Sequence, residues 1–151
     1  MTEPNLIYIE EPKLTFGFNQ KIEDPRDGLT LFGTYTNKSH YGQIRVGIIG
    51  VKKQREAVKK YLKLLHKPIQ SSEKDIARPY FPGLEATFGI EINIDNIQEI
   101  DINEKEISKF LHYTDGHQRV FNLTSLFADK LKKYLNEEHI PVSVWFVAIS
   151  D

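Results

Sequence analysis

The segment Gly47-Ile48-Ile49-Gly50-Val51-Lys52-Lys53 has the residue types best suited to anion binding. It spans the end of a β-branched run and the start of a helical pattern, and the first turn of a helix offers free backbone N–H groups to an anion. Lys52 and Lys53 would add positive charge there. The segment matches neither the Gly-x-Gly-x-x-Gly fingerprint nor a Walker loop. Two interpretations therefore stand: an anion site, or two glycines that let a strand and a helix pack closely.

A strongly basic stretch continues from this segment. Residues 51–74 hold eight Lys or Arg residues against two Glu, whereas residues 84–110 hold seven acidic residues against two Lys. Helical spacing of the apolar residues predicts that these positive charges project outward. The candidates for sequence-independent contact with nucleic-acid phosphates are Lys52, Lys53, Arg55 and Lys59. A solvated helix face is the alternative, because surface lysines are common.

Several kinds of catalytic chemistry are excluded by residue type and spacing. The chain has no cysteine, which excludes a disulfide framework, a thiolate zinc site, an iron–sulfur cluster and a cysteine nucleophile. Its five histidines show no recognised metal spacing, and the sequence has no Gly-x-Ser-x-Gly nucleophile elbow. His112, Asp115 and His117 could meet around a loop, although a capping or surface role suits them better. We therefore expect no catalytic residue, no metal ligand and no cofactor in this chain.

The composition is typical of a soluble globular protein. The chain has 151 residues, which suits one domain, and it is 40% hydrophobic and 27% charged. No apolar run is long enough to cross a bilayer, and the N-terminus lacks the features of a signal peptide. We therefore expect a cytoplasmic protein without a membrane partner.

The elements that must position the basic residues follow an α/β pattern. A β-branched strand is predicted over 43–49, an alternating strand over 86–94, and an almost continuously apolar strand over 142–149. We expect these strands to share one mainly parallel sheet with 142–149 in its middle, because that strand is apolar on both faces. Asn103 and Glu106 have the spacing of a capping box. The predicted helices cover 52–66, 104–112 and 119–138.

The N-terminal part has a different pattern. Residues 1–41 are predicted to be a β-rich entry segment, with a strand-like run over 28–36. Before that run, Asp24-Pro25-Arg26-Asp27-Gly28 combines a proline that fixes φ with a glycine that tolerates positive φ, which predicts a structural turn. We expect Arg26 to stabilise this turn by pairing with Asp24 or Asp27.

Several segments resemble the short prokaryotic Argonautes that pair with a TIR-APAZ protein. The resemblance covers nearly the whole chain. The segments that carry it are Ile7-Tyr8-Ile9-Glu10-Glu11-Pro12, Phe16, Asn19-Gln20, Asp24-Pro25-Arg26-Asp27-Gly28-Leu29, Leu31-Phe32-Gly33, Val46-Gly47-Ile48-Ile49-Gly50, Lys67-Pro68-Ile69, Arg78-Pro79-Tyr80-Phe81-Pro82-Gly83, Glu85-Ala86-Thr87-Phe88-Gly89 and Val144-Trp145-Phe146-Val147.

The resemblance implies a role in guided defence. Members of this family consist of a MID and a PIWI domain, bind a guide RNA by its 5′ end and pair it with single-stranded DNA. Target recognition assembles a higher-order oligomer and activates NAD hydrolysis by the TIR domain of the TIR-APAZ partner. The Argonaute itself lacks the catalytic acidic set and cuts nothing.

On this resemblance, residues 42–151 correspond to the first half of a Rossmann-like MID domain, and we expect the chain to be the N-terminal part of a longer protein. The family's 5′-phosphate pocket, where Mg²⁺ could bind, follows the strand at 142–149. No pocket residue can therefore be assigned to this chain. Residues 1–151 would hold the partner, contact another Argonaute copy and support the guide channel.

Two functions from other classes remain open. The first is a small nucleotide-binding α/β enzyme that uses the turn at 47–53. The second is a structural module that binds a protein partner and no nucleic acid.

Overall fold

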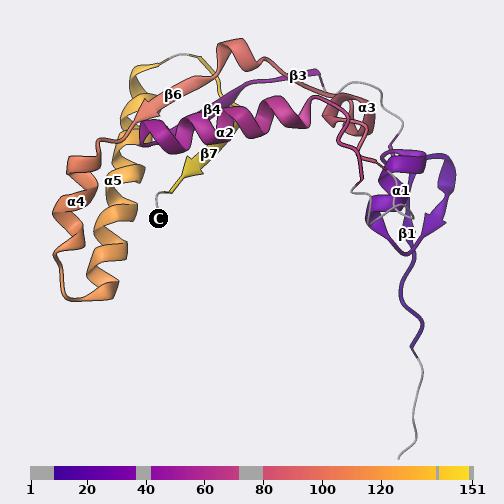
Figure 1. The fold of residues 1–151 in the computed structure, drawn as a ribbon, viewed down its shortest axis with the longest axis horizontal. Coiled ribbons are helices and arrows are strands. Elements are labelled where there is room, and N and C mark those ends of the chain that lie inside the picture. The colour runs from indigo at the N-terminus through magenta and orange to yellow at the C-terminus, as the bar shows by residue number, and fades with distance from the viewer. Residues whose placement is uncertain (1–8, 37–41, 72–79, 139, 150–151) are drawn as a thin grey trace, which may run out of the picture.

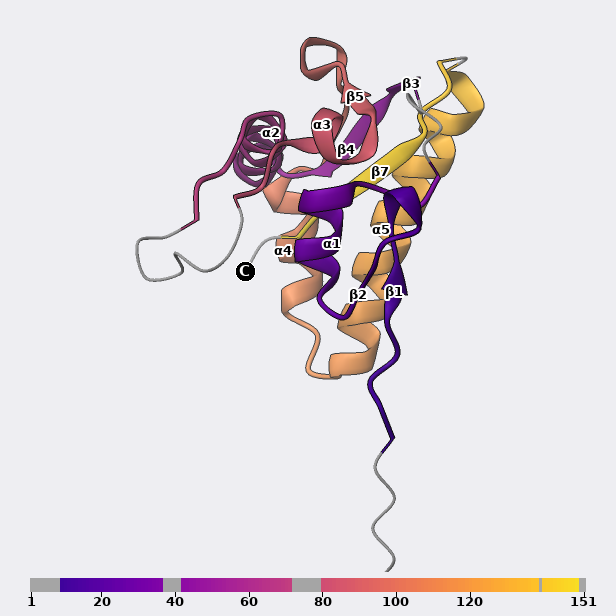
Figure 2. The same cartoon turned by 90° about the vertical axis from the view of Figure 1, so that its right-hand side faces the viewer.

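The computed structural model describes residues 9–36, 42–71, 80–138 and 140–149 of the 151-residue chain. Within this part, three units follow one another along an arch (Figure 1). A small N-terminal unit lies at one end, a parallel sheet with its long helix α2 forms the middle, and a hairpin of helices α4 and α5 projects at the other end. The view turned by 90° shows α2 and α5 on either side of the sheet (Figure 2).

The central sheet has three parallel strands in the order β6-β4-β7. Its middle strand, β4, is buried at every position, and Ile48 and Ile49 are fully buried on opposite faces. Ile48 joins an apolar cluster with Leu62 of α2, while Ile49 joins a second cluster packed against α5. Parallel strands covered on both faces are typical of α/β proteins. The strands span Val46–Gly50 (β4), Gln98–Asp101 (β6) and Val144–Ala148 (β7).

The predicted α/β class with a mainly parallel sheet is confirmed, and so are the three predicted helices. The capping box is present, with the Asn103 side chain accepting from backbone N–H groups and Glu106 accepting from the Asn103 N–H. The last helix begins three residues earlier than predicted, because Asp115 caps it by accepting from the His117 N–H at 2.9 Å. The helices span Lys52–Leu65 (α2), Glu104–Leu111 (α4) and Gly116–Glu137 (α5).

The prediction that 43–49, 86–94 and 142–149 share one sheet is wrong. Residues 84–88 form a short helix, which Gly89 ends in the left-handed conformation at φ 66°. The Asn93 side chain then accepts from the Asp95 N–H and starts a 3₁₀ turn, so the strand between these two turns is only three residues long. That strand pairs in a separate two-stranded parallel sheet. The elements are α3 (Leu84–Phe88), β5 (Ile90–Ile92), η3 (Ile94–Asn96) and its partner β3 (Gly42–Ile44).

The prediction that 142–149 lies in the middle of the sheet is also wrong. β4 takes the middle position, and β7 lies at one edge with Val144 and Val147 42% and 53% exposed. β4 is the strand against which both covering helices converge, so its two faces are buried more completely than those of β7.

The N-terminal unit contains a helix where a turn and a strand were expected. α1 spans Pro25–Phe32, with Pro25 in its first turn and Asp24 as its N-cap. The Asp24 carboxylate accepts from the backbone N–H groups of Arg26 and Asp27 at 2.8 and 3.3 Å, so the expected side-chain pairing of Arg26 is replaced by a helix cap. Gly28 is required by close packing, because a Cβ there would lie 2.2 Å from the Phe16 ring. The remaining elements are β1 (Leu14–Thr15), η1 (Gly17–Asn19) and β2 (Lys21–Ile22).

No helix in the described part of the chain has the length and apolar character needed to span a bilayer.

Candidate nucleic-acid interface

The N-terminus of α2 follows β4 directly, at the carboxyl edge of the three-stranded sheet. In open α/β sheets this edge is where ligands bind. Val51 is the N-cap and its side chain cannot accept a hydrogen bond, so it leaves the first N–H groups of the helix without a side-chain cap. Lys52 and Lys53 are exposed in this first turn. The arrangement combines free N–H donors, the positive end of a helix dipole and two ammonium groups.

Arg55 and Lys59, the other two predicted contacts, are bound to carboxylates of β6. The Arg55 guanidinium lies 2.8 Å from Asp101 Oδ1 and 3.4 Å from Glu99 Oε2, and its side chain is only 11% exposed. The Lys59 Nζ lies 2.9 Å from Glu99 Oε1 and also pairs with Glu56. The structure therefore divides the four predicted residues into two that are exposed and form no ion pair with the described residues, and two that join α2 to β6.

Strand geometry explains why two carboxylates of β6 meet the same helix. Glu99 and Asp101 are two residues apart, so both side chains project from the face of the sheet that α2 covers. Ile100, between them, projects to the opposite face and joins the cluster beneath α5. The alternation of acidic and apolar residues was visible in the sequence, but it did not identify which basic helix the carboxylates would meet.

The contacts of Lys59 favour the charged forms of Glu56 and Lys59. The hydrogen bond from Lys59 is the main reason that the pKa of the Glu56 carboxyl lies below its usual value; partial burial opposes this shift, and nearby cations add to it. The hydrogen bonds to Glu56 and then to Glu99 raise the pKa of the Lys59 ammonium. The positive charge of Lys59 is therefore retained but locally balanced, which lowers its value as a contact for a phosphate.

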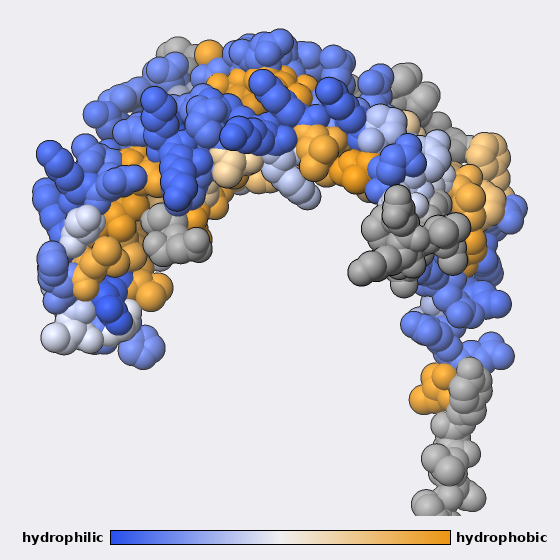
Figure 3. All heavy atoms as spheres, viewed as in Figure 1, coloured by the Kyte–Doolittle hydropathy of each residue, from blue (hydrophilic) through white to orange (hydrophobic). Residues whose placement is uncertain are grey.

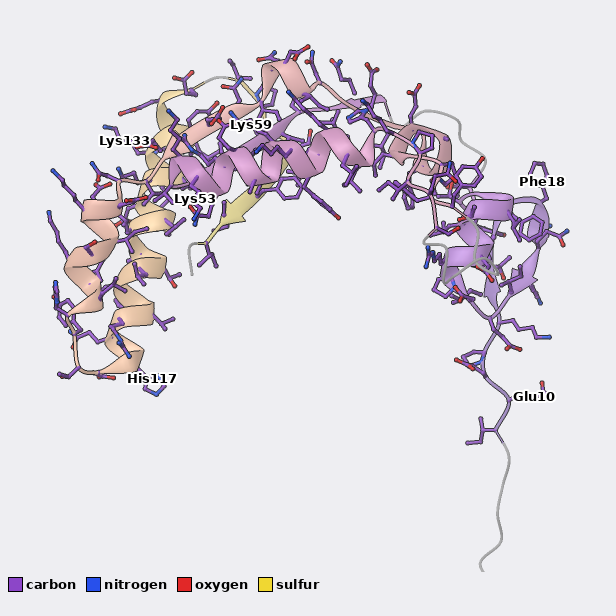
Figure 4. All side chains as sticks on the ribbon, in the orientation of Figure 1. Glu10, Phe18, Lys53, Lys59, His117 and Lys133 are labelled. Carbon is purple, nitrogen blue, oxygen red and sulfur yellow. The ribbon has the colours of Figure 1, made fainter. Side chains whose placement is uncertain are left out.

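The next turns of α2 border a shallow cavity of about 380 Å³ with lining charges of both signs. Lys60 and Lys63 contribute cations, and Glu56, Asp95 and Glu99 contribute carboxylates. A polyanion entering this cavity would meet like charges, so the first turn of α2 is the better phosphate contact. Figure 4 shows Lys59 on the convex side of the arch and Lys53 on the opposite side of the same helix.

The predicted structural turn lies elsewhere in the molecule. Asp24, Arg26, Asp27 and Gly28 belong to α1, at the end of the arch distant from the first turn of α2 (Figure 1). Their role is to begin and pack α1. His112 and Asp115 flank the loop between α4 and α5, where Asp115 acts as a cap, and no group of metal-binding side chains is found among the described residues.

No family model matches the chain, and a search of curated proteins found no match. The fold and the site together define the class of protein: an α/β protein whose three-stranded parallel sheet leads from its central strand into an uncapped, lysine-bearing helix N-terminus.

Proposed function

We propose that this chain belongs to a guide-RNA-directed Argonaute defence complex that acts in the cytoplasm as a non-catalytic subunit. In this proposal the complex recognises invading single-stranded DNA and activates the NAD-hydrolysing TIR domain of a TIR-APAZ partner. The sequence resemblance motivates the proposal, and the parallel α/β sheet is compatible with a MID-like half-domain.

One observation carries the nucleic-acid part of the proposal. Lys52 and Lys53 are exposed at an uncapped helix N-terminus, whereas Arg55 and Lys59 are held by β6 carboxylates. The free pair would contact guide or target phosphates. Such contacts position a strand without reading its bases, so they would support every guide sequence equally.

The test is a salt titration of binding to 5′-phosphorylated single-stranded RNA. The double variant Lys52→Ala/Lys53→Ala should weaken binding across unrelated RNA sequences and lower the magnitude of the slope of log K against log salt by about 0.7 for each phosphate that is no longer neutralised. Lys105→Ala/Lys109→Ala on α4 removes the same charge from another exposed helix and is the matched control. Equal effects in both variants, or none in either, would contradict a specific role for the α2 N-terminus.

The uncapped helix N-terminus also suits a mononucleotide phosphate, which favours the nucleotide-binding enzyme as a second candidate. A thermal-shift titration with ATP and NAD separates the two functions. Stabilisation by a mononucleotide, together with its hydrolysis above a heat-killed control, would support the enzyme. RNA binding without nucleotide hydrolysis supports the Argonaute subunit.

A further inference from the structure

Asp101 lies at the same edge of the sheet as the first turn of α2. It is the last residue of β6 and pairs in register with Gly50, the last residue of β4, and α2 begins two residues after Gly50. The Ile102 N–H donates to the Gly50 carbonyl at 3.0 Å and holds the end of β6 beside that turn. Asp101 therefore places a carboxylate near the phosphate contact proposed for Lys52 and Lys53.

Arg55 belongs to the same turn of α2 and is held at this edge. Its backbone N–H donates to the Val51 carbonyl at 3.0 Å, which closes the first turn of the helix. Long side chains of an α-helix lean toward the helix N-terminus. The Arg55 Nη2 lies 2.8 Å from Asp101 Oδ1, whereas its Nη1 lies 3.4 Å from Glu99 Oε2. Asp101 is therefore the closer of the two carboxylates that hold Arg55.

The two members of this ion pair differ in how much of their surface meets solvent. The Arg55 side chain is 11% exposed, whereas the Asp101 side chain is 63% exposed. An ion pair with so exposed a carboxylate contributes little to stability, because water screens the attraction. The Asp101 carboxylate can therefore be exchanged for another anion with little loss of stability.

The Arg55 guanidinium also has a donor that the fold leaves unused. Arg55 Nε is buried and has no hydrogen-bond partner in the part of the chain that the structure describes. Both of its ion pairs use the terminal nitrogens instead. A phosphate fits the fork of a guanidinium with two parallel hydrogen bonds. Arg55 is therefore suited to a phosphate as well as to Asp101, once its side chain turns away from β6.

Charges of both signs gather where these residues lie. The space-filling view shows hydrophilic side chains over the beginning of α2 (Figure 3). Lys52 and Lys53 supply exposed cations there, whereas the Asp101 carboxylate opposes them and neutralises Arg55. Loss of this one carboxylate would release a cation and remove a repulsion, so Asp101 sets how strongly this edge attracts a polyanion.

We propose that the Asp101–Arg55 ion pair is an autoinhibitory contact that keeps Arg55 from contacting nucleic-acid phosphates. This inference rests on the proposed function, because it concerns the same helix N-terminus. Asp101 occupies the guanidinium and repels phosphates, which lowers the sequence-independent affinity for RNA. A strand then stays bound only where other contacts also hold it, so Asp101 promotes specificity by limiting non-specific binding.

The test compares Asp101→Asn with Asp95→Asn in salt titrations of the full chain with 5′-phosphorylated single-stranded RNA. Both variants make the same chemical change and remove the same charge, but Asp95 borders the cavity beside later turns of α2. Asp101→Asn should raise the magnitude of the slope of log K against log salt by about 0.7, because Arg55 neutralises one more phosphate. At about 0.1 M salt this slope corresponds to about fivefold tighter binding. Asp95→Asn should leave the slope unchanged.

The Arg55 side chain reports on the contact directly in NMR spectra of the arginine side chains. RNA should shift the Nε–H signal of Arg55 in Asp101→Asn and leave it almost unchanged in the unaltered chain. Inorganic tripolyphosphate is the second probe and should give the same contrast. An Arg55 signal that neither probe moves in Asp101→Asn overturns the proposal. Equal RNA affinity of Asp101→Asn and Asp95→Asn also overturns it.

Urea denaturation checks that the Asp101 carboxylate is exchangeable. Asp101→Asn and Asp95→Asn should have nearly the same stability, and a marked loss confined to Asp101→Asn would overturn the proposal, because the ion pair would then be a structural link.

Failure of this inference and failure of the proposed function have different signatures. If Lys52→Ala/Lys53→Ala binds RNA as well as its control variant does, the proposed function fails, and the tripolyphosphate spectra still decide the inference. If the lysine variant weakens binding but Asp101→Asn matches Asp95→Asn, only the autoinhibitory contact fails.

Discussion

The two sides of the central sheet are attached to their neighbours by different kinds of contact. On the β6 side, ion pairs join Arg55 and Lys59 of α2 to Glu99 and Asp101, and a capping box begins the next helix. On the β7 side, Val144 and Val147 remain exposed, and β7 is attached by its backbone pairing with β4 and by apolar packing of Trp145, Phe146 and Ala148. The β6 side is therefore held by polar contacts within the chain, whereas apolar side chains on the β7 side remain partly exposed.

We expect the greatest difference in stability between the alanine variants of two leucines of α2. Leu62 is fully buried against β4, so Leu62→Ala should lower the free energy of unfolding by about 2–5 kcal/mol. Leu64 is exposed and lies two residues away, so Leu64→Ala should lower the free energy of unfolding by about 0.5 kcal/mol or less. Urea denaturation measures both. A destabilisation at Leu64 as large as that at Leu62 would mean that Leu64 is already covered and that the two sides of the sheet do not differ in this way.

The second effect tests how β7 is attached to β4. A Cβ at Gly47 would lie 2.4 Å from the Trp145 ring, so Gly47→Ala must push β7 or the ring away. We expect a destabilisation of about 1–3 kcal/mol and a changed Trp145 emission spectrum. Gly116→Ala is the control, because the nearest atom to its Cβ is 3.7 Å away. Unchanged emission in Gly47→Ala would show that the ring does not limit the approach of the two strands.

The third effect comes from a substitution that removes a polar contact on the β6 side. Asn103→Ala deletes the N-cap of α4 and should lower the free energy of unfolding by about 1 kcal/mol. Ser108→Ala, which removes an exposed hydroxyl bonded to the Glu104 carbonyl in the same helix, should be nearly neutral. Thermal unfolding of both variants checks the difference. Equal stability of the two variants would show that the capping box does not stabilise α4.

The smallest expected effect is on the stability of the protein at acidic pH. Lys130 donates to Glu106 at 2.8 Å and, with the Asn103 backbone N–H, lowers the pKa of the Glu106 carboxyl in the folded state. The ionised Glu106 carboxylate therefore contributes its full stabilisation of the fold when the pH is above the pKa of Glu106 in the unfolded chain, about 4.3. This stabilisation is lost as the pH falls through the lower pKa of Glu106 in the folded protein.

Glu106→Gln should remove this part of the acid dependence, a change of about 0.5 kcal/mol because the pair is partly exposed. Unfolding free energies at pH 6 and pH 3 measure the change. Glu104→Gln in the same turn controls for the removal of a charge near the helix N-terminus. If the Glu106 variant were destabilised by acid as much as the unaltered chain, this carboxylate would not be a source of the acid dependence.

Local chemistry made several elements predictable from the sequence. The apolar spacing of α2, the Asn103–Glu106 box and the β-branched run of β4 are decided by residues within a few positions of one another. The exposure of Lys52 and Lys53 at the candidate interface was predictable for the same reason. α1 was also predictable, because aspartate before a proline is a signature of a helix start, but the following glycine made the segment resemble a turn.

The amino-acid sequence therefore specifies the type of each long element and the α/β class. Three other features depend on the tertiary structure: β4 rather than β7 is central, β5 pairs in a separate sheet, and Arg55 meets Asp101 across 46 positions of sequence. The physical reason is that helix periodicity and capping act over one or two turns. Strand order and ion pairing instead depend on which distant segments share a face, and an apolar strand such as β7 has the same sequence pattern in the middle of a sheet and at its edge.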